Sequence, residues 1–349
     1  MSENINSKTR YNHISSTGKI TPLQTREEAL EVLSKKGYIW FDFVAPTRED
    51  LNWLMEPFSL HPLAIEDCLD EDQVPKIDDF STNTFILFNS FEYIEKEFFI
   101  DEIDFFIGKN FIISVRTCHT GDRNFFSKLD GLISRNMENV KKGPDFLLHI
   151  IIDYIVDEKF KVIEAMQEEL DTWEEVILDK PSSFEPAALL YLRKNLLVLR
   201  KSLFHEREIL IKICRGDSKY VSQKAIYHFR DVYDHLARFF ETIEIYREMI
   251  TSLMEMYLSM INTQMARMGN RTNQVVRRLT LINTIFMPLT LLAGIGGMSE
   301  WTNIMGPGHW KFAYLVLLLT MVVIGFISYI ILKRLEAKDK NMADSEIDN

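Results

Sequence analysis

The sequence predicts an α+β membrane protein, with a cytosolic α/β domain, a long helical stalk and two C-terminal transmembrane helices. Three observations support this fold class. Residues 279–297 and 312–332 contain no charged side chain, and each run is long enough to cross a bilayer as a helix. Short β-branched and aromatic runs occupy the first third of the chain. Helical periodicity then continues from residue 143 to the spans.

Composition excludes several other classes of protein. The chain has 349 residues, of which 46% are hydrophobic and 26% charged, so a disordered or fibrous protein does not fit. A net charge of −11 argues against a nucleic-acid partner. The three scattered cysteines match no disulfide framework, and the eight histidines form no HExxH motif. With no GxxxxGK[ST] loop either, we expect that the protein is not an enzyme.

The first part of the chain reads as a compact α/β domain. Residues 1–20 show no apolar pattern and are expected to be disordered, whereas residues 21–142 form the domain. Apolar and β-branched runs predict strands at 38–43, 84–93, 98–107 and 110–116. Helices are expected at 26–35 and 48–69, the second interrupted by Pro57 and Pro62.

Residues 143–216 predict a hairpin of two long helices that meet near Pro181. Between residues 153 and 179 the first of them carries ten acidic and two basic side chains, a net charge of −8. Such a helix can simply present a solvated face. It can equally raise the local concentration of cations, and the residues alone leave both interpretations open.

The stalk, residues 217–278, repeats apolar residues every seven positions in two registers. One register is Phe229, Leu236, Ile243, Ile250 and Tyr257, and the other is Val232, Phe239, Tyr246, Leu253 and Met260. This pattern predicts a helix that packs along another helix, in its own chain or in a neighbour.

Two spans and a short loop follow the stalk. The first span is 279–297, the loop 298–311, the second span 312–332 and the tail 333–349, which is nearly neutral and expected to be disordered. Arginines precede the first span and Lys333 and Arg334 follow the second, so both termini are expected in the cytoplasm of a cell (inner) membrane protein. A buried helical hairpin of a soluble protein is the alternative, which two consecutive charge-free runs disfavour.

Polar and small residues follow one face of the first span. They recur at spacings of three and four: Asn273, Val276, Thr280, Asn283, Met287, Thr290 and Gly294. Such a stripe suits a water-filled pore, and a pore with one such helix per subunit needs several subunits. Packing between helices through small and polar residues is the alternative.

Four segments together resemble the CorA family of divalent-cation transporters. They are QVVRRLTLINTIFMPLTLLAGIGGMS at 274–299, HPLAIEDCLDEDQVPKIDDF at 61–80, LRKNLLVLRKSL at 192–203 and HFRDVYDH at 228–235. The resemblance implies a funnel-shaped homopentamer. It also implies channel-like transport of Mg²⁺, with Co²⁺ and Ni²⁺ as further ions, driven by the electrochemical gradient. Cytosolic divalent cations, Mg²⁺ among them, would gate this pore.

The resemblance also implies site residues, position by position. In the pore they are Asn273, Val276, Leu279, Met287, Thr290, Gly294, Gly297, Met298 and Ser299, and the polar stripe adds Asn283. The cytosolic metal ligands would be Glu66, Asp67, Asp153, Asp231 and His235, whose carboxylates suit Mg²⁺. Without the resemblance, Glu66 and Asp67 read as solvated acids, and Asp231 with His235 as a surface pair.

The mouth of the pore departs from the family pattern. Ser299 stands where the family has Asn in Gly-Met-Asn, and Gly296 stands where Tyr is usual. Glu300 follows directly, and a ring of its carboxylates would concentrate cations at the outer mouth. This departure leaves two alternatives open: a Zn²⁺ transporter of the same superfamily, and a membrane-anchored cation sensor that does not conduct.

Overall fold

The computed structural model describes residues 8–70, 73–116, 123–298 and 310–347. The chain divides into two compact units, Met1–Leu258 and Ser259–Asn349. The division falls inside one helix, α9 (Gln223–Gly296). Each unit is therefore described by itself.

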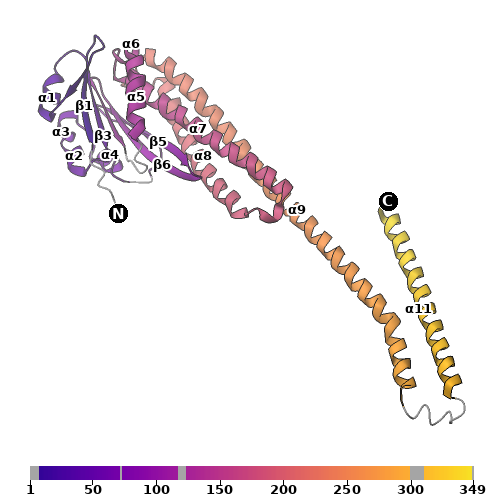
Figure 1. The fold of residues 1–349 in the computed structure, drawn as a ribbon. Coiled ribbons are helices and arrows are strands. Elements are labelled where there is room, and N and C mark those ends of the chain that lie inside the picture. The colour runs from indigo at the N-terminus through magenta and orange to yellow at the C-terminus, as the bar shows by residue number, and fades with distance from the viewer. Residues whose placement is uncertain (1–7, 71–72, 117–122, 299–309, 348–349) are drawn as a thin grey trace. The chain divides into compact units, whose positions relative to one another are not determined.

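A seven-stranded mixed sheet forms the centre of the first unit, in the order β2-β1-β3-β7-β6-β5-β4 (Figure 1). β3 and β7 are parallel, and all other neighbouring strands are antiparallel. The strands are β1 (Lys8–Ile14), β2 (Ile20–Leu23), β3 (Tyr38–Val44), β4 (Lys76–Asp79), β5 (Thr84–Ile94), β6 (Glu97–Ile107) and β7 (Phe111–Arg116).

Helices cover both faces of this sheet, so that alternate residues of one strand enter two separate cores. One face lies under α1 (Arg26–Val32), α2 (Arg48–Asn52), α3 (Met55–Phe58) and α4 (Pro62–Asp67), with Phe41 and Phe106 in its core. The other lies under α5 (Arg123–Arg135), α6 (Met137–Val140) and α7 (Pro144–Asp179), with Trp40 and Phe105 in its core. This double coverage explains why all seven residues of β3 are buried.

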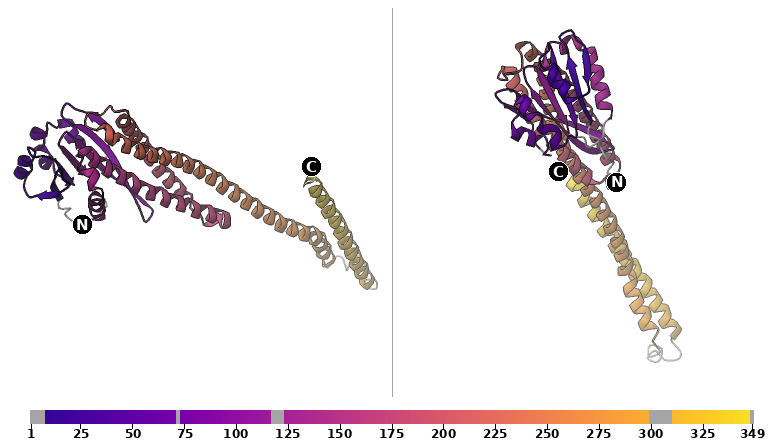
Figure 2. Two further views of the ribbon diagram at one scale, coloured as in Figure 1. Left: turned by 90° about the horizontal axis from the view of Figure 1, so that it is seen from above. Right: turned by 90° about the vertical axis from the view of Figure 1, so that its left-hand side faces the viewer.

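The helices α7, α8 (Pro186–Arg215) and the first part of α9 pack side by side (Figure 2). A short 3₁₀ helix (Pro181–Ser183) separates α7 from α8. The predicted heptad residues of α9 are buried from Phe229 to Leu253, and Tyr257 packs against the same core. The prediction of a helix-packing seam is confirmed, and the partners of the seam lie in its own chain.

The second unit contains the rest of α9 and α11 (Trp310–Ile347). Both helices are long and apolar enough to cross a membrane, by length and composition. Tyr314 donates a hydrogen bond to the carbonyl oxygen of Gly296, at 2.9 Å. A Cβ on Gly325 would lie 3.7 Å from Leu289, so the two helices approach closely at glycine.

Several sequence predictions need correction. Residues 8–14 are strand β1 rather than disordered, because Arg10 pairs with Asp42 and Asp130 and Tyr11 packs edge-on against Phe41. Strands β2 and β4 were missed. The helix α9 begins at Gln223, six residues later than expected. The tail is helical to Ile347, since the stretch after Gly325 contains no glycine or proline to end α11. The helix expected at 48–69 is three short helices, α2, α3 and α4, with Pro57 inside α3 and Pro62 at the start of α4. The other predicted strands and helices are confirmed, with shifts of a few residues.

Candidate functional site

Two parallel helices, α7 and α9, form the seam that holds most of the predicted metal ligands. The ring of Phe160 stacks on that of Phe239 with centroids 5.9 Å apart. Further along, Tyr246 donates a hydrogen bond to Gln167, at 2.7 Å. These contacts fix the register of the two helices, so residues about 80 positions apart in the chain lie opposite each other.

Six titratable side chains occupy the end of this seam nearest the start of both helices. We call them the seam cluster: His149, Asp153 and Asp157 from α7, and His228, Asp231 and His235 from α9. Helical spacing puts each set of three along one line. The charges interact across the seam, because Asp153 is influenced by Asp157, His235, Asp231 and His228.

Burial and like charge shift the pKa values of the cluster. Burial, assisted by the carboxylate of Asp157, raises the pKa of Asp153 to about 6, although His235 opposes this. Burial and the neighbouring His228 lower the pKa of His149 to about 4. The ring centroids of His149 and His228 are 5.2 Å apart, with 54° between the ring planes. Burial therefore favours the neutral forms of His149 and Asp153.

The structure brings together three of the five predicted metal ligands: Asp153, Asp231 and His235. Glu66 and Asp67 lie elsewhere, on α4, where Pro62 starts a short helix capped by His61. Asp67 pairs with Lys76 at 2.6 Å, and Glu66 is exposed. Within the described residues of one chain, no group of three His, Cys, Asp or Glu side chains is placed to hold a metal ion.

Three members of the seam cluster were absent from the predicted site: His149, Asp157 and His228. Their signal was present in the spacing, since His149 lies four residues before Asp153 and His228 three residues before Asp231. Spacing along the chain does not show the register between α7 and α9, because that register comes from the packing of the two helices.

The predicted pore stripe lies along the exposed face of the apolar part of α9. A groove there is lined by Asn283, Met287, Thr290, Gly294 and Met298 together with Phe286, Pro288, Leu291 and Ile295. At about 100° per residue, the stripe falls about 180° around the helix from Leu281, Ile285 and Leu292, which are half-buried. Asn273, Val276, Leu279 and Gly297 are exposed too. Ser299 and Glu300 lie outside the described residues.

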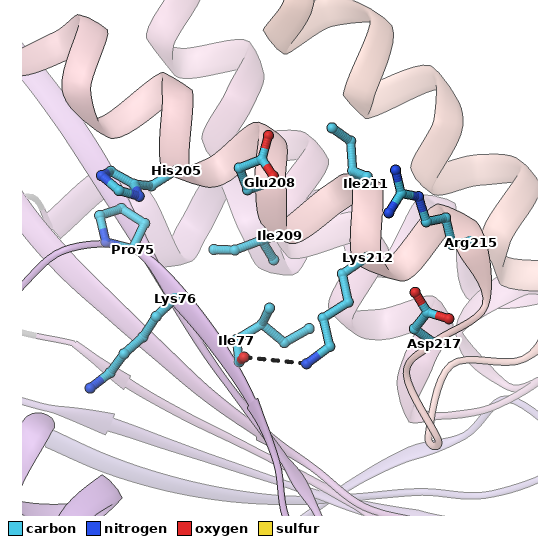
Figure 3. A pocket seen from close by; sticks show the side chains of 10 residues that line it. All are labelled: Pro75, Lys76, Ile77, His205, Glu208, Ile209, Ile211, Lys212, Arg215 and Asp217. Atoms are coloured by element: carbon cyan, nitrogen blue, oxygen red, sulfur yellow. Dashed lines mark hydrogen bonds between the residues drawn. The ribbon is translucent and has the colours of Figure 1, made fainter.

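A second pocket lies in the first unit, between β4 and α8 (Figure 3). Lys212 pairs with Asp79 at 2.7 Å and reaches the carbonyl oxygen of Ile77 at 3.4 Å. The ammonium group of Lys76 is engaged by Asp67. Two of the basic side chains that line this pocket are therefore already engaged in ion pairs.

One chain thus combines two apolar spans, a polar stripe on the first span, and an α/β body that carries a seam of carboxylates and imidazoles. This combination indicates a class of protein: a two-span membrane protein that handles cations. Residues 35–334 match the family described as CorA-like Mg²⁺ transporter protein. The chain belongs to that family.

Curated relatives and a solved structure agree with this assignment. The cobalt/magnesium transport protein CorA of Thermotoga maritima is 33% identical over 299 residues, covering 84% of this chain and 82% of that protein. The putative metal ion transporter YfjQ of Bacillus subtilis is 30% identical, covering 85% and 89%. The CorA magnesium transporter structure from Methanocaldococcus jannaschii matches with a TM-score of 0.68 at 22% identity, covering 96% of this chain and 99% of that one. The predicted fold class is confirmed.

Proposed function

We propose that this protein transports divalent cations, Mg²⁺ and Co²⁺ foremost, through a pore in the cell membrane. The observation that carries the proposal is the family match over residues 35–334, nearly the whole chain. The Thermotoga relative, whose name includes both ions, is similar over most of its own length. The alternatives of a Zn²⁺ transporter and of a non-conducting sensor gain no support from these relatives.

The pore would form from the exposed stripe of α9 in a homopentamer with both termini in the cytoplasm. Mg²⁺ gives up its waters reluctantly, so amide, hydroxyl and main-chain groups that bond those waters suit its passage. Asn283, Thr290 and Gly294 supply such groups on one line. Ser299 and Glu300 would line the outer mouth of this pore. A potential of 100 mV supplies about 4.6 kcal/mol for a doubly charged ion, so no ATP is needed.

Regulation would come from cytosolic Mg²⁺ bound between subunits. In one chain, Glu66 and Asp67 do not join the seam cluster, which supports a site made by α4 of one subunit and α7–α9 of its neighbour. Carboxylates from Asp153 and Asp231, with His235 beside them, would complete it. Bound Mg²⁺ would hold the pore closed, and loss of the ion would free the subunits to open. The division into domains proposed from the sequence fits this scheme, with the body as sensor and the spans as pore.

Uptake into liposomes tests the transport proposal. The full chain is reconstituted, and Mg²⁺, Co²⁺, Ni²⁺ and Zn²⁺ are compared under a set potential and a set pH gradient. We expect Mg²⁺ and Co²⁺ uptake that follows the potential, and at least a tenfold loss in Asn283→Leu because an apolar side chain cannot bond the ion's waters. Thr320→Leu, in the second span, is the matched control. Potential-independent, proton-coupled Zn²⁺ uptake would support the Zn²⁺ alternative, and no uptake of any ion the sensor.

Protection from proteolysis tests the regulatory site separately. Rising Mg²⁺ should protect the body of the wild-type protein, and Asp231→Ala should shift the midpoint to about tenfold higher Mg²⁺ because one carboxylate ligand is lost. Asp234→Ala, three residues away and exposed, should leave the midpoint unchanged. Equal midpoints in Asp231→Ala and wild type would rule out this site.

A further inference from the structure

The seam cluster contains a pair of imidazoles that the carboxylate site for Mg²⁺ does not use. His149 of α7 and His228 of α9 face each other with ring centroids 5.2 Å apart. Both are half-buried, and aromatic rings enclose them: Phe146 contacts His228, and Phe229 contacts His149 edge-on. We propose that His149 and His228 form a nitrogen-ligated site for a borderline transition ion such as Co²⁺, Ni²⁺ or Zn²⁺.

The separation of the rings matches what one shared ion requires. A metal about 2.1 Å from one nitrogen of each imidazole lies roughly 3.2 Å from each ring centre, so tetrahedral ligation places the centres about 5.3 Å apart. The observed separation of 5.2 Å agrees.

Carboxylates one helical turn away can complete the site. Asp153 follows His149 by four residues, and Asp231 follows His228 by three. Asp231 interacts electrostatically with His149, and Asp153 with His228, so each carboxylate lies near the imidazole of the opposite helix. As placed, the described side chains form no three-ligand group, so one carboxylate would have to change its rotamer to reach an ion held by the rings. Paired His and carboxylate positions on facing helices are an established way to build metal sites in bundles.

The donor set determines which ions this site prefers. Imidazole nitrogen favours Co²⁺, Ni²⁺ and Zn²⁺, whereas Mg²⁺ favours oxygen and retains its waters. The site therefore differs in ligand chemistry from the Mg²⁺ site that shares Asp153 and Asp231, and a bound ion would join α7 to α9.

Cobalt spectroscopy tests the site on the full-length protein in detergent. Co²⁺ is titrated, and visible absorption reports its coordination, since four-coordinate Co²⁺ absorbs far more strongly than the six-coordinate ion. We expect a strong band that Zn²⁺ abolishes and a hundredfold excess of Mg²⁺ does not. His149→Phe and His228→Phe keep the ring volume but remove the nitrogens, and each should weaken Co²⁺ binding at least tenfold. His205→Phe, on α8, is the matched control.

Circular dichroism and the thermal midpoint check that each variant folds, and His149→Gln serves as a second variant if a phenylalanine disturbs the seam. The proposal is wrong if wild type and the folded double variant bind Co²⁺ equally, if the spectrum is six-coordinate throughout, or if Mg²⁺ displaces Co²⁺ at equal concentration. A negative result for this metal site can be distinguished from a negative result for transport. A cobalt band in a protein that takes up no ion contradicts transport alone, and uptake without the band contradicts this site alone.

Discussion

At the scale of single residues, Lys159 is a buried charged side chain of the body. It is fully buried, and its ammonium group donates to Glu206, at 2.5 Å, and to the carbonyl oxygen of Asn89, at 2.6 Å. The rings of Phe88 and Phe91 lie 5.4 and 4.9 Å from the charge. Burial lowers the pKa of Lys159, and the carboxylate of Glu206 opposes that change. The pair joins α7 and α8 to strand β5.

Removing one partner of this pair should be costly. In Lys159→Met the carboxylate of Glu206 remains buried without its cation, so we expect a loss of about 3–5 kcal/mol in the free energy of unfolding. The double variant Lys159→Met/Glu206→Leu should recover part of that loss: no buried charge remains, but the main-chain N–H and C=O of Asn89 lose their partners. Denaturant titration of the protein and its variants measures both values. An equal loss in the single and double variants would contradict this account.

Asp104 on β6 is a second buried charged residue, and its effect on stability depends on pH. It is buried against Cys68, and burial, with the nearby Glu102, raises its pKa well above the usual range. The carboxyl of Asp104 therefore binds its proton more tightly in the folded protein than in the unfolded chain. Asp104 contributes stability below the ordinary pKa of an aspartate, and this contribution is lost as pH rises through the pKa of the folded protein. Asp104→Asn removes the titrating group.

We therefore expect Asp104→Asn to raise the free energy of unfolding by about 1–2 kcal/mol at pH 8. The gain should shrink as pH falls, because the wild-type carboxyl is then protonated as well. Thermal midpoints at pH 5 and pH 8 compare the two proteins. A gain that is equal at both pH values would contradict the assignment of the shift to Asp104.

At the scale of elements, α9 contacts α11 at Gly296. A Cβ on Gly296 would overlap the side chain of Leu317, and Tyr314 bonds the carbonyl oxygen of the same glycine. Glycine therefore lets the two helices approach here with Leu317 in its present rotamer, as small residues commonly allow in membrane helices. Gly294, two residues earlier, faces open space within the chain.

The different surroundings of Gly296 and Gly294 allow a matched pair of substitutions. Gly296→Leu should destabilise the packing of the two spans by about 1–3 kcal/mol through overpacking. Leu317→Ala, added to it, should restore part of the loss because it vacates the overlapping volume. Gly294→Leu should leave the thermal midpoint of the detergent-solubilised protein within error of wild type. Equal destabilisation by both leucines would contradict the packing seen at Gly296.

Prediction of elements succeeded where periodicity was long. The heptads of α9 and the apolar runs of β3, β5, β6 and β7 located those elements to within a few residues. Prediction failed at β1 and β4, which are rich in polar residues, and at β2, which has four residues and contains a proline. Their stability comes from pairing with neighbouring strands and from ion pairs such as Arg10 with Asp42, and a local pattern does not contain those contacts.

At the scale of the whole molecule, charge is unevenly distributed. The helix α7 concentrates acidic residues, and most of those after Asp153 are exposed, including Glu164, Glu168, Asp171 and Glu175. An exposed row of this kind raises the local concentration of divalent cations at low ionic strength. The effect acts over about 10 Å at 0.1 M salt and is screened at higher salt.

Neutralising that row tests whether it attracts cations. Changing Glu164, Glu168, Asp171 and Glu175 to their amides should raise the Mg²⁺ concentration needed for protection from proteolysis by about threefold at 20 mM salt, and leave it unchanged at 0.5 M salt. The same four positions lie outside the seam cluster, so direct ligands are retained. An equal change at both salt concentrations would contradict a long-range electrostatic role.

The sequence by itself determined the class of this protein. Two charge-free spans, a heptad stalk and the motifs at residues 228–235 and 274–299 are local patterns, and local patterns are legible along a chain. Tertiary structure decided what depends on register: that α7 lies beside α9, that His149 therefore meets His228, and that Glu66 and Asp67 lie apart from the seam cluster. Side chains about 80 residues apart become neighbours through helix packing, and spacing along one helix carries no information about the phase of another.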